Sequence, residues 1–181
     1  MSDMELLLWA RGTGLQIAGV IFIVGMILRI LEILLLSRKR DLSEPRAGGM
    51  LPGLRTIFTR MIPARGMWSN LIAGYIFHVG FLVVLMFFVP HILFFNNAFG
   101  WQWSGLPNSV IDVVTMVSIA ALVFALVLRL IDPVRRFLSN FDDYLALVVT
   151  LLPLLTGYLA FHSQALPYTQ MLAVHILSVD L

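Results

Sequence analysis

The sequence contains no cysteine and has few charged side chains. The absence of cysteine excludes disulfides, thiolate catalysis and iron–sulfur clusters bound by this chain. Charged residues make up 12 % of the 181 residues and apolar residues 60 %, whereas soluble domains have about 25 % and about 45–50 %. The formal charge is +2, and no glycine-rich phosphate loop is present. We expect no nucleic-acid partner. A chain this apolar is expected to reside in a membrane.

Long apolar runs predict the fold class. A helix needs about 20 mostly apolar residues to cross a bilayer, and four segments meet that requirement: 15–36, 71–95, 109–131 and 144–161. A fifth segment, 170–181, is too short, and we expect that the sequence is truncated there. We therefore predict an all-α transmembrane helical bundle of the five-span type, forming one integral membrane domain over residues 1–181.

The basic residues predict the orientation. Seven of the twelve Lys and Arg residues lie between the first two spans, and Arg135 and Arg136 lie between spans three and four. The connections 96–107 and 162–170 contain none. Because positively charged loops stay in the cytoplasm, we expect the N-terminus outside the inner (cytoplasmic) membrane. The indoles that would then lie at the outer interface are those of Trp9, Trp101 and Trp103.

The basic loop 37–70 contains the stretch MLPGLRTIFTRMIPARGMW. Apolar and basic residues alternate there at near-helical spacing, which is typical of an amphipathic helix on the membrane surface that docks a soluble partner. A plain surface connector is the equal alternative.

All four histidines lie within the predicted spans or at their ends. His78 and His91 share span two, separated along it by about 20 Å of helical rise, which suits two centres at different depths. The predicted topology places His78 on the inner side and His91, His162 and His175 on the outer side. His91 and His175 at one depth would supply the two axial imidazoles of a haem b iron, with His162 as the alternative ligand. On a straight helix His78 and His91 point about 140° apart, and a kink at Pro90 would change that angle.

Two other interpretations of the histidines stay open. Each histidine would serve simply as a hydrogen-bond partner between helices. A zinc site would need four ligands at one depth, which His91, His162, His175 and Asp112 would supply.

The second, fourth and fifth apolar segments resemble a known family. SNLIAGYIFHVGFLVVL with a second histidine on the same span, DYLALVVTLLPLLTGYLAF and MLAVHILSVDL resemble the helices of the respiratory nitrate reductase gamma-subunit family. This family includes the membrane cytochrome b subunits of sulfite-reductase-linked and heterodisulfide-reductase-like complexes.

The resemblance implies two b haems stacked across the membrane. Quinol would be oxidised, or quinone reduced, at the outer haem, and electrons would pass to a cytoplasmic iron–sulfur subunit. By position, His78 would ligate the inner haem and His91 and His175 the outer one. The chain lacks the family's last ligand and its Pro-Phe-Ser-Arg stretch, and its two span-two histidines are spaced more widely than in the nitrate reductase branch. Ile111 and Asp112 stand where that branch has a basic residue.

Other polar residues and glycines within the spans have two interpretations each. Asp112 would accept a quinol proton near the outer haem, or act only as a solvated acid at a helix start. Arg29 would contact a haem propionate, or pair with Glu32 three residues later. The glycines that leave room for a porphyrin or for a close helix crossing are Gly74, Gly80 and Gly157.

These features together predict a haem b membrane subunit that links the quinone pool to cytoplasmic iron–sulfur partners. The alternative is a haem-free membrane anchor or transporter-type protein whose histidines pack or relay protons.

Overall fold

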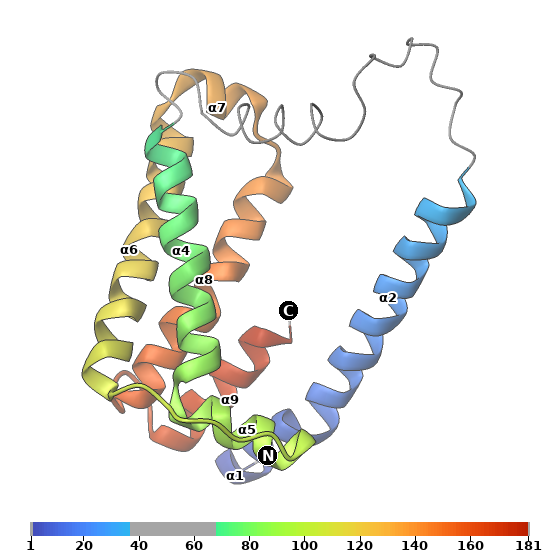
Figure 1. The fold of residues 1–181 in the computed structure, drawn as a ribbon, viewed down its shortest axis with the longest axis vertical. Coiled ribbons are helices and arrows are strands. Elements are labelled where there is room, and N and C mark those ends of the chain that lie inside the picture. Colours follow the sequence, from blue (N-terminus) through green and yellow to red (C-terminus); the bar gives the residue numbers. More distant parts are fainter. Residues whose placement is uncertain (1, 37–67, 181) are drawn as a thin grey trace, which may run out of the picture.

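The computed structural model describes residues 2–36 and 68–180, and within them it is helical without strands. The elements are α1 (Asp3–Trp9), the π-helix η1 (Ala10–Gly14), α2 (Leu15–Leu35), α4 (Trp68–Phe87), α5 (Val89–Phe99), α6 (Asn108–Ile131), α7 (Pro133–Leu138), α8 (Phe141–Phe161) and α9 (Tyr168–Val179). Figure 1 shows α4, α6 and α8 side by side. The predicted all-α class is confirmed.

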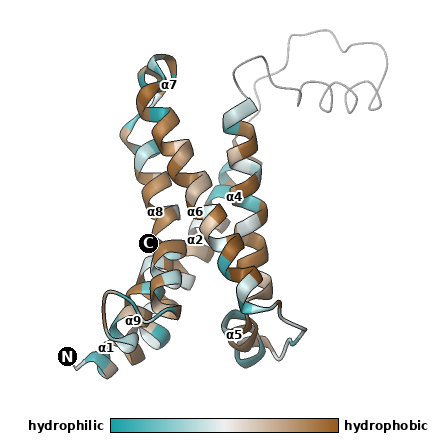
Figure 2. Ribbon diagram, turned by 90° about the vertical axis from the view of Figure 1, so that its left-hand side faces the viewer, coloured by the Kyte–Doolittle hydropathy of each residue, from teal (hydrophilic) through white to brown (hydrophobic). Residues whose placement is uncertain are grey.

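Four helical runs are long and apolar enough to cross a membrane: Asp3–Leu35, Trp68–Phe87, Asn108–Ile131 and Phe141–Phe161. The last two agree closely with the predicted spans 109–131 and 144–161. Helix α9 covers most of the predicted fifth segment but has only 12 residues, so five spans stay a prediction. Figure 2 shows hydrophobic residues along most of α6 and α8, as a lipid environment requires.

The packed core lies between α4, α6 and α8. Ala73 and Phe77 of α4 meet Ala121 and Leu122 of α6 and Leu154 of α8 in one buried cluster. Polar side chains are buried in these helices without unpaired donors, because each hydroxyl donates to the backbone carbonyl four residues earlier: Thr115 to Ile111, Ser118 to Val114 and Thr156 to Leu152. The bundle thus accommodates polar residues at membrane depth at little cost.

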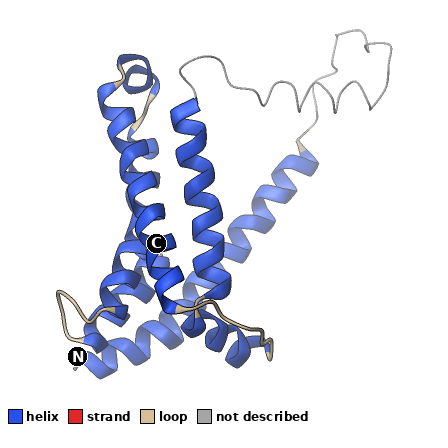
Figure 3. Cartoon of the chain, turned by 60° about the vertical axis from the view of Figure 1, so that its left-hand side comes forward, coloured by secondary structure: helices blue, strands red, loops and turns tan. Residues whose placement is uncertain are grey.

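The predicted second span, 71–95, is wrong as one continuous helix. Helix α4 ends at Phe87, and Phe88 is extended, with φ −79° and ψ 125°. Pro90 in the first turn of α5 is the physical reason: it has no N–H, and its ring clashes with a carbonyl one turn earlier in a continuous helix. Figure 3 shows α5 turning away from the direction of α4. His91 therefore lies on a separate helix from His78.

The carbonyls freed by this break find new donors. The indole Nε1 of Trp103 donates to the carbonyl of Met86 at 2.5 Å, and the backbone N–H of Leu106 donates to that of Phe87 at 3.0 Å. Non-helical backbone at membrane depth is tolerated where such groups are satisfied within the protein. The segment between α5 and α6 thereby stabilises the break.

The first helical run begins earlier than the predicted span 15–36. Ser2 caps α1 in a capping box with Glu5, which explains the start at Asp3. Helix α1 packs on α9, where Ala10 of η1 and Ala173 of α9 are fully buried. Helix α2 then leans away from the other helices (Figure 1) and buries none of its residues. Its apolar surface faces lipid or another molecule.

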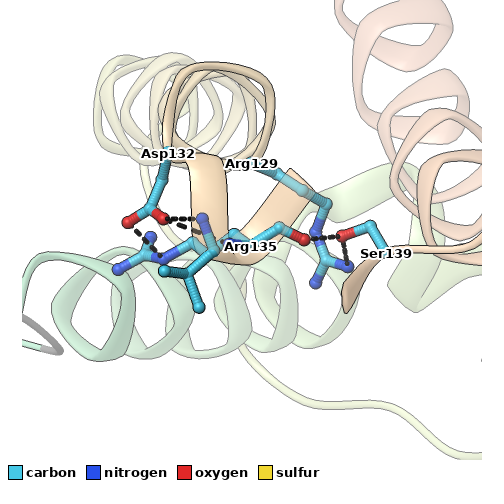
Figure 4. Close-up of polar contacts among 5 residues, drawn as sticks. Arg129, Asp132, Arg135 and Ser139 are labelled. Atoms are coloured by element: carbon cyan, nitrogen blue, oxygen red, sulfur yellow. Dashed lines mark hydrogen bonds and ion pairs between the residues drawn. The ribbon is translucent and has the colours of Figure 1, made fainter. Parts of the chain in front are cut away.

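The short helix α7 joins α6 to α8 at the end opposite α5 (Figure 1). Asp132 caps α7 by accepting from the N–H groups of Val134 and Arg135, while Arg129 donates to the hydroxyl of Ser139 at 3.0 Å (Figure 4). Arg129 also pairs with Asp143 at 3.1 Å. The basic residues of this turn thus gather at one end of the bundle, although the direction in which that end faces stays a prediction. The predicted loop 37–70, with its amphipathic segment, lies outside the described residues up to residue 67.

Candidate functional site

Two histidines from separate helices face one another. His91 lies in the first turn of α5 and His175 in the middle of α9. Their ring centroids are 6.3 Å apart and their planes differ by 18°. On a straight second span, the side chains of His78 and His91 would point about 140° apart. The break at Phe88 changes the chain direction between them, so this angle no longer applies.

Hydrogen bonds fix the His91 ring. Its Nδ1 lies 3.1 Å from the carbonyl oxygen of Val84, in the last turn of α4. A carbonyl oxygen only accepts, so Nδ1 must carry the proton. The neutral ring then has its lone pair on Nε2, which is the state that a metal ligand requires.

The His175 ring is held in the same way from α8. Its Nδ1 lies 3.2 Å from Oγ1 of Thr156. The Thr156 hydroxyl donates to the Leu152 carbonyl at 2.6 Å, so its oxygen accepts from Nδ1–H of His175. Ser178 lies 3.0 Å from the same oxygen and donates to the His175 carbonyl at 2.6 Å. Nε2 is again the nitrogen with the free lone pair.

The separation of the two rings fits ligation of one metal. Two imidazole nitrogens bound at about 2.0–2.1 Å on opposite sides of an ion place their ring centroids about 6 Å apart. The observed 6.3 Å agrees with that value. Both Nδ1 atoms are occupied by the protein, as ligating histidines usually are. The centroid separation and the occupied Nδ1 atoms are compatible with a bis-histidine iron, and haem binding stays a prediction.

Asp112 and His162 form a second, separate pair. Nε2 of His162 lies 3.1 Å from Oδ1 of Asp112, and the Tyr158 ring packs on the imidazole at a centroid distance of 4.4 Å. Polar groups in a membrane protein pair in this manner. In the part of the chain that the structure describes, no three His, Cys, Asp or Glu side chains are grouped as a metal site. The four-ligand zinc alternative has no support there.

His78 lines a cavity of about 490 Å³ between α4, α6 and α8. Its Nδ1 lies 2.6 Å from the carbonyl of Gly74, which again leaves Nε2 free. Arg129, Asn140 and Asp143 line the end of the cavity nearest α7. His78 thus lies apart from the His91–His175 pair, as the two-depth interpretation requires, and its role as a ligand stays a prediction.

Arg29 lies on the exposed surface of α2 and pairs with Glu32. Its predicted contact with a haem propionate stays a prediction. Arg129 lines the His78 cavity. In the sequence, only its position at the end of a predicted span marked it.

Sequence reasoning missed the hydroxyl groups around His175. Neither Thr156 nor Ser178 belongs to a motif. Ser178 lies three residues after His175, a spacing that indicates a shared helix face, whereas nothing in the sequence marks Thr156.

A comparison with curated proteins finds a relative of part of this chain. The chain is 30 % identical over 110 residues to a protein of Nitratidesulfovibrio vulgaris (strain Hildenborough) described only as "Protein". The match covers 61 % of this chain and 48 % of the relative, so the chain spans about half the length of the curated relative it matches. No protein-family model and no solved structure matches the chain.

Proposed function

We propose that this chain is a haem b membrane subunit that exchanges electrons between the quinol/quinone pool and a cytoplasmic iron–sulfur partner. The observation that carries the proposal is the His91–His175 pair, with near-parallel rings 6.3 Å apart. Two helices that meet only in the folded protein supply these imidazoles, and each ring is fixed by a hydrogen bond at Nδ1.

The residues of the chain have defined tasks in this proposal. His91 and His175 hold the haem through Nε2, and Val84 and Thr156 keep both rings in the ligating tautomer. The haem supplies one-electron chemistry, while the protein supplies ligation, orientation and exclusion of water. His78, with Arg129 nearby, is proposed to bind a second haem in its cavity on the cytoplasmic side, with the N-terminus of the chain outside the inner membrane.

Asp112 remains the predicted proton acceptor for the quinol, and its carboxylate is paired with the imidazole of His162. The pair places a carboxylate and an imidazole at the end of the bundle where α6 begins and α8 ends. A haem-free transporter would use the same pair as a proton relay, which makes that protein class the second candidate.

A visible spectrum separates the two candidates. Purified wild-type protein with haem should show sharp alpha and Soret bands in a reduced-minus-oxidised spectrum. His175→Ala and His91→Ala should each lower the haem content, whereas His162→Ala should retain it because His162 pairs with Asp112. Full pigment in His175→Ala would show that the ligand assignment is wrong, and a colourless wild-type protein after haem supply would favour the haem-free candidate.

A further inference from the structure

The connection between α6 and α8 exposes large apolar side chains. Five residues, here called the α7 patch, are each at least 67 % exposed: Ile131, Val134, Phe137, Leu138 and Phe141. Val134, Phe137 and Leu138 stand at helical positions i, i+3 and i+4, so they share one face of α7. The exposed fraction of Phe137 reaches 88 %. An apolar patch of this kind marks contact with a membrane or with another protein.

The charged side chains of the same turn are paired within the protein. Asp132 pairs with Arg135 at 3.5 Å, and Arg129 donates to the hydroxyl of Ser139 (Figure 4). The side chains of Asp132 and Arg135 are 38 % and 23 % exposed, which is less than any residue of the α7 patch. In a turn surrounded by water, charged side chains are the exposed ones and large apolar side chains are covered. The surroundings of the α7 patch are therefore apolar.

The length of α6 places the α7 patch at the membrane surface. Helix α6 has 24 residues, which rise about 36 Å at about 1.5 Å per residue. This length exceeds the hydrocarbon thickness of about 30 Å but not the total of about 40–45 Å that includes the headgroups. A helix that begins at one interface then ends in the headgroup layer of the opposite leaflet. Ile131 ends α6 and Phe141 begins α8, so membrane spans flank the patch on both sides and lipid reaches it without a partner protein.

We propose that α7 is an interfacial anchor whose patch inserts between the lipids of that leaflet, while Arg136 binds the phosphate of an anionic phospholipid. Arg136 is exposed and directly precedes Phe137, so the two side chains leave the helix about 100° apart. Phenylalanine and leucine on one face, with a basic residue beside them, are typical of helices that lie in the interface. The anionic headgroup adds electrostatic attraction to the apolar contact. The anchor thereby holds the turn between α6 and α8 at a fixed depth.

Spin labelling of the full chain in phospholipid vesicles tests the anchor, because the chain has no cysteine of its own. A nitroxide on Phe137→Cys is exposed either to oxygen, which concentrates in lipid, or to a water-soluble nickel chelate. In vesicles of phosphatidylcholine and phosphatidylglycerol, the ratio of oxygen access to nickel access should be severalfold higher than for a nitroxide on Arg136→Cys. Both residues are exposed neighbours on α7, so the control differs in the face of the helix. Leu138→Cys repeats the measurement at a second position of the patch, so a local disturbance at residue 137 does not decide the outcome.

The lipid composition tests the contact of Arg136. Vesicles of phosphatidylcholine alone should give the nickel chelate more access to the label at residue 137, and Arg136→Gln should remove this difference between the two lipids. A high oxygen ratio that depends neither on the lipid nor on Arg136 overturns the phosphate contact. Ratios at residues 137 and 138 that equal the ratio at residue 136 overturn the anchor. If these labels are then shielded only in native membranes, another protein covers the patch in place of lipid.

Discussion

The imidazole of His175 lies directly against Gly157 of α8. A Cβ placed on Gly157 would come within 3.0 Å of Cε1 and 3.2 Å of Nδ1 of that ring. The His175 ring therefore occupies the space that a side chain at residue 157 would fill. Since Thr156 holds the same ring at Nδ1, α8 determines the position of His175 at two adjacent residues.

Gly157→Ala should lower the haem content, because the new methyl group pushes the His175 ring away from its hydrogen bond with Thr156. The matched control is Gly25→Ala on α2, where a Cβ meets nothing within 4 Å. Both changes raise helix propensity by about 1 kcal/mol, so only the contact with the ring differs. Haem per polypeptide, from the pyridine haemochrome spectrum, checks the result, and equal contents in the two variants would contradict it.

Thr156→Val should weaken haem binding about 10–100-fold, as loss of a group that orients a metal-ligating histidine does. The valine keeps the shape of the side chain but cannot accept a hydrogen bond from Nδ1–H of His175. Thr115→Val is the control, since Thr115 makes the same hydrogen bond to the carbonyl four residues earlier, on α6. Haem titration of the apoprotein measures the affinity. A similar loss in both variants would mean that the effect lies in helix stability.

Trp103→Phe should destabilise the protein by about 1–3 kcal/mol, because the Met86 carbonyl loses its donor at the break between α4 and α5. Trp101→Phe is the control: Trp101 is 62 % exposed. Unfolding in detergent, followed by far-UV circular dichroism, measures the difference. Equal stability of the two variants would show that the indole hydrogen bond does not stabilise the break.

The third and fourth predicted spans were readable from the sequence, because the length of an apolar run largely decides where such a helix lies. Helix α6 begins at Asn108 and α8 ends at Phe161, within one residue of the predictions. The break at Phe88 was not readable, since a proline in an apolar run is compatible with a kink as well as a full break. The outcome depends on whether donors such as Trp103 reach the freed carbonyls, and that depends on tertiary packing.

The candidate site was predictable only in part. The sequence predicted that His91 and His175 lie close together, because the position of a residue along a span determines its depth in the membrane. Their rings are indeed neighbours. Asp112 and His162, in contrast, are 50 residues apart in sequence, and their contact needed the register between α6 and α8.

The absence of cysteine makes the predicted orientation directly testable, because a single introduced cysteine would be the only thiol that a labelling reagent can modify. Ser104 lies in the segment before α6 and Arg136 on α7, and both are exposed. If positive charge keeps the α7 end in the cytoplasm, a membrane-impermeant maleimide should label Ser104→Cys in intact cells and Arg136→Cys only after permeabilisation. The reverse pattern would place the His91–His175 pair on the inner side, and quinol would then have to exchange its protons with the cytoplasm.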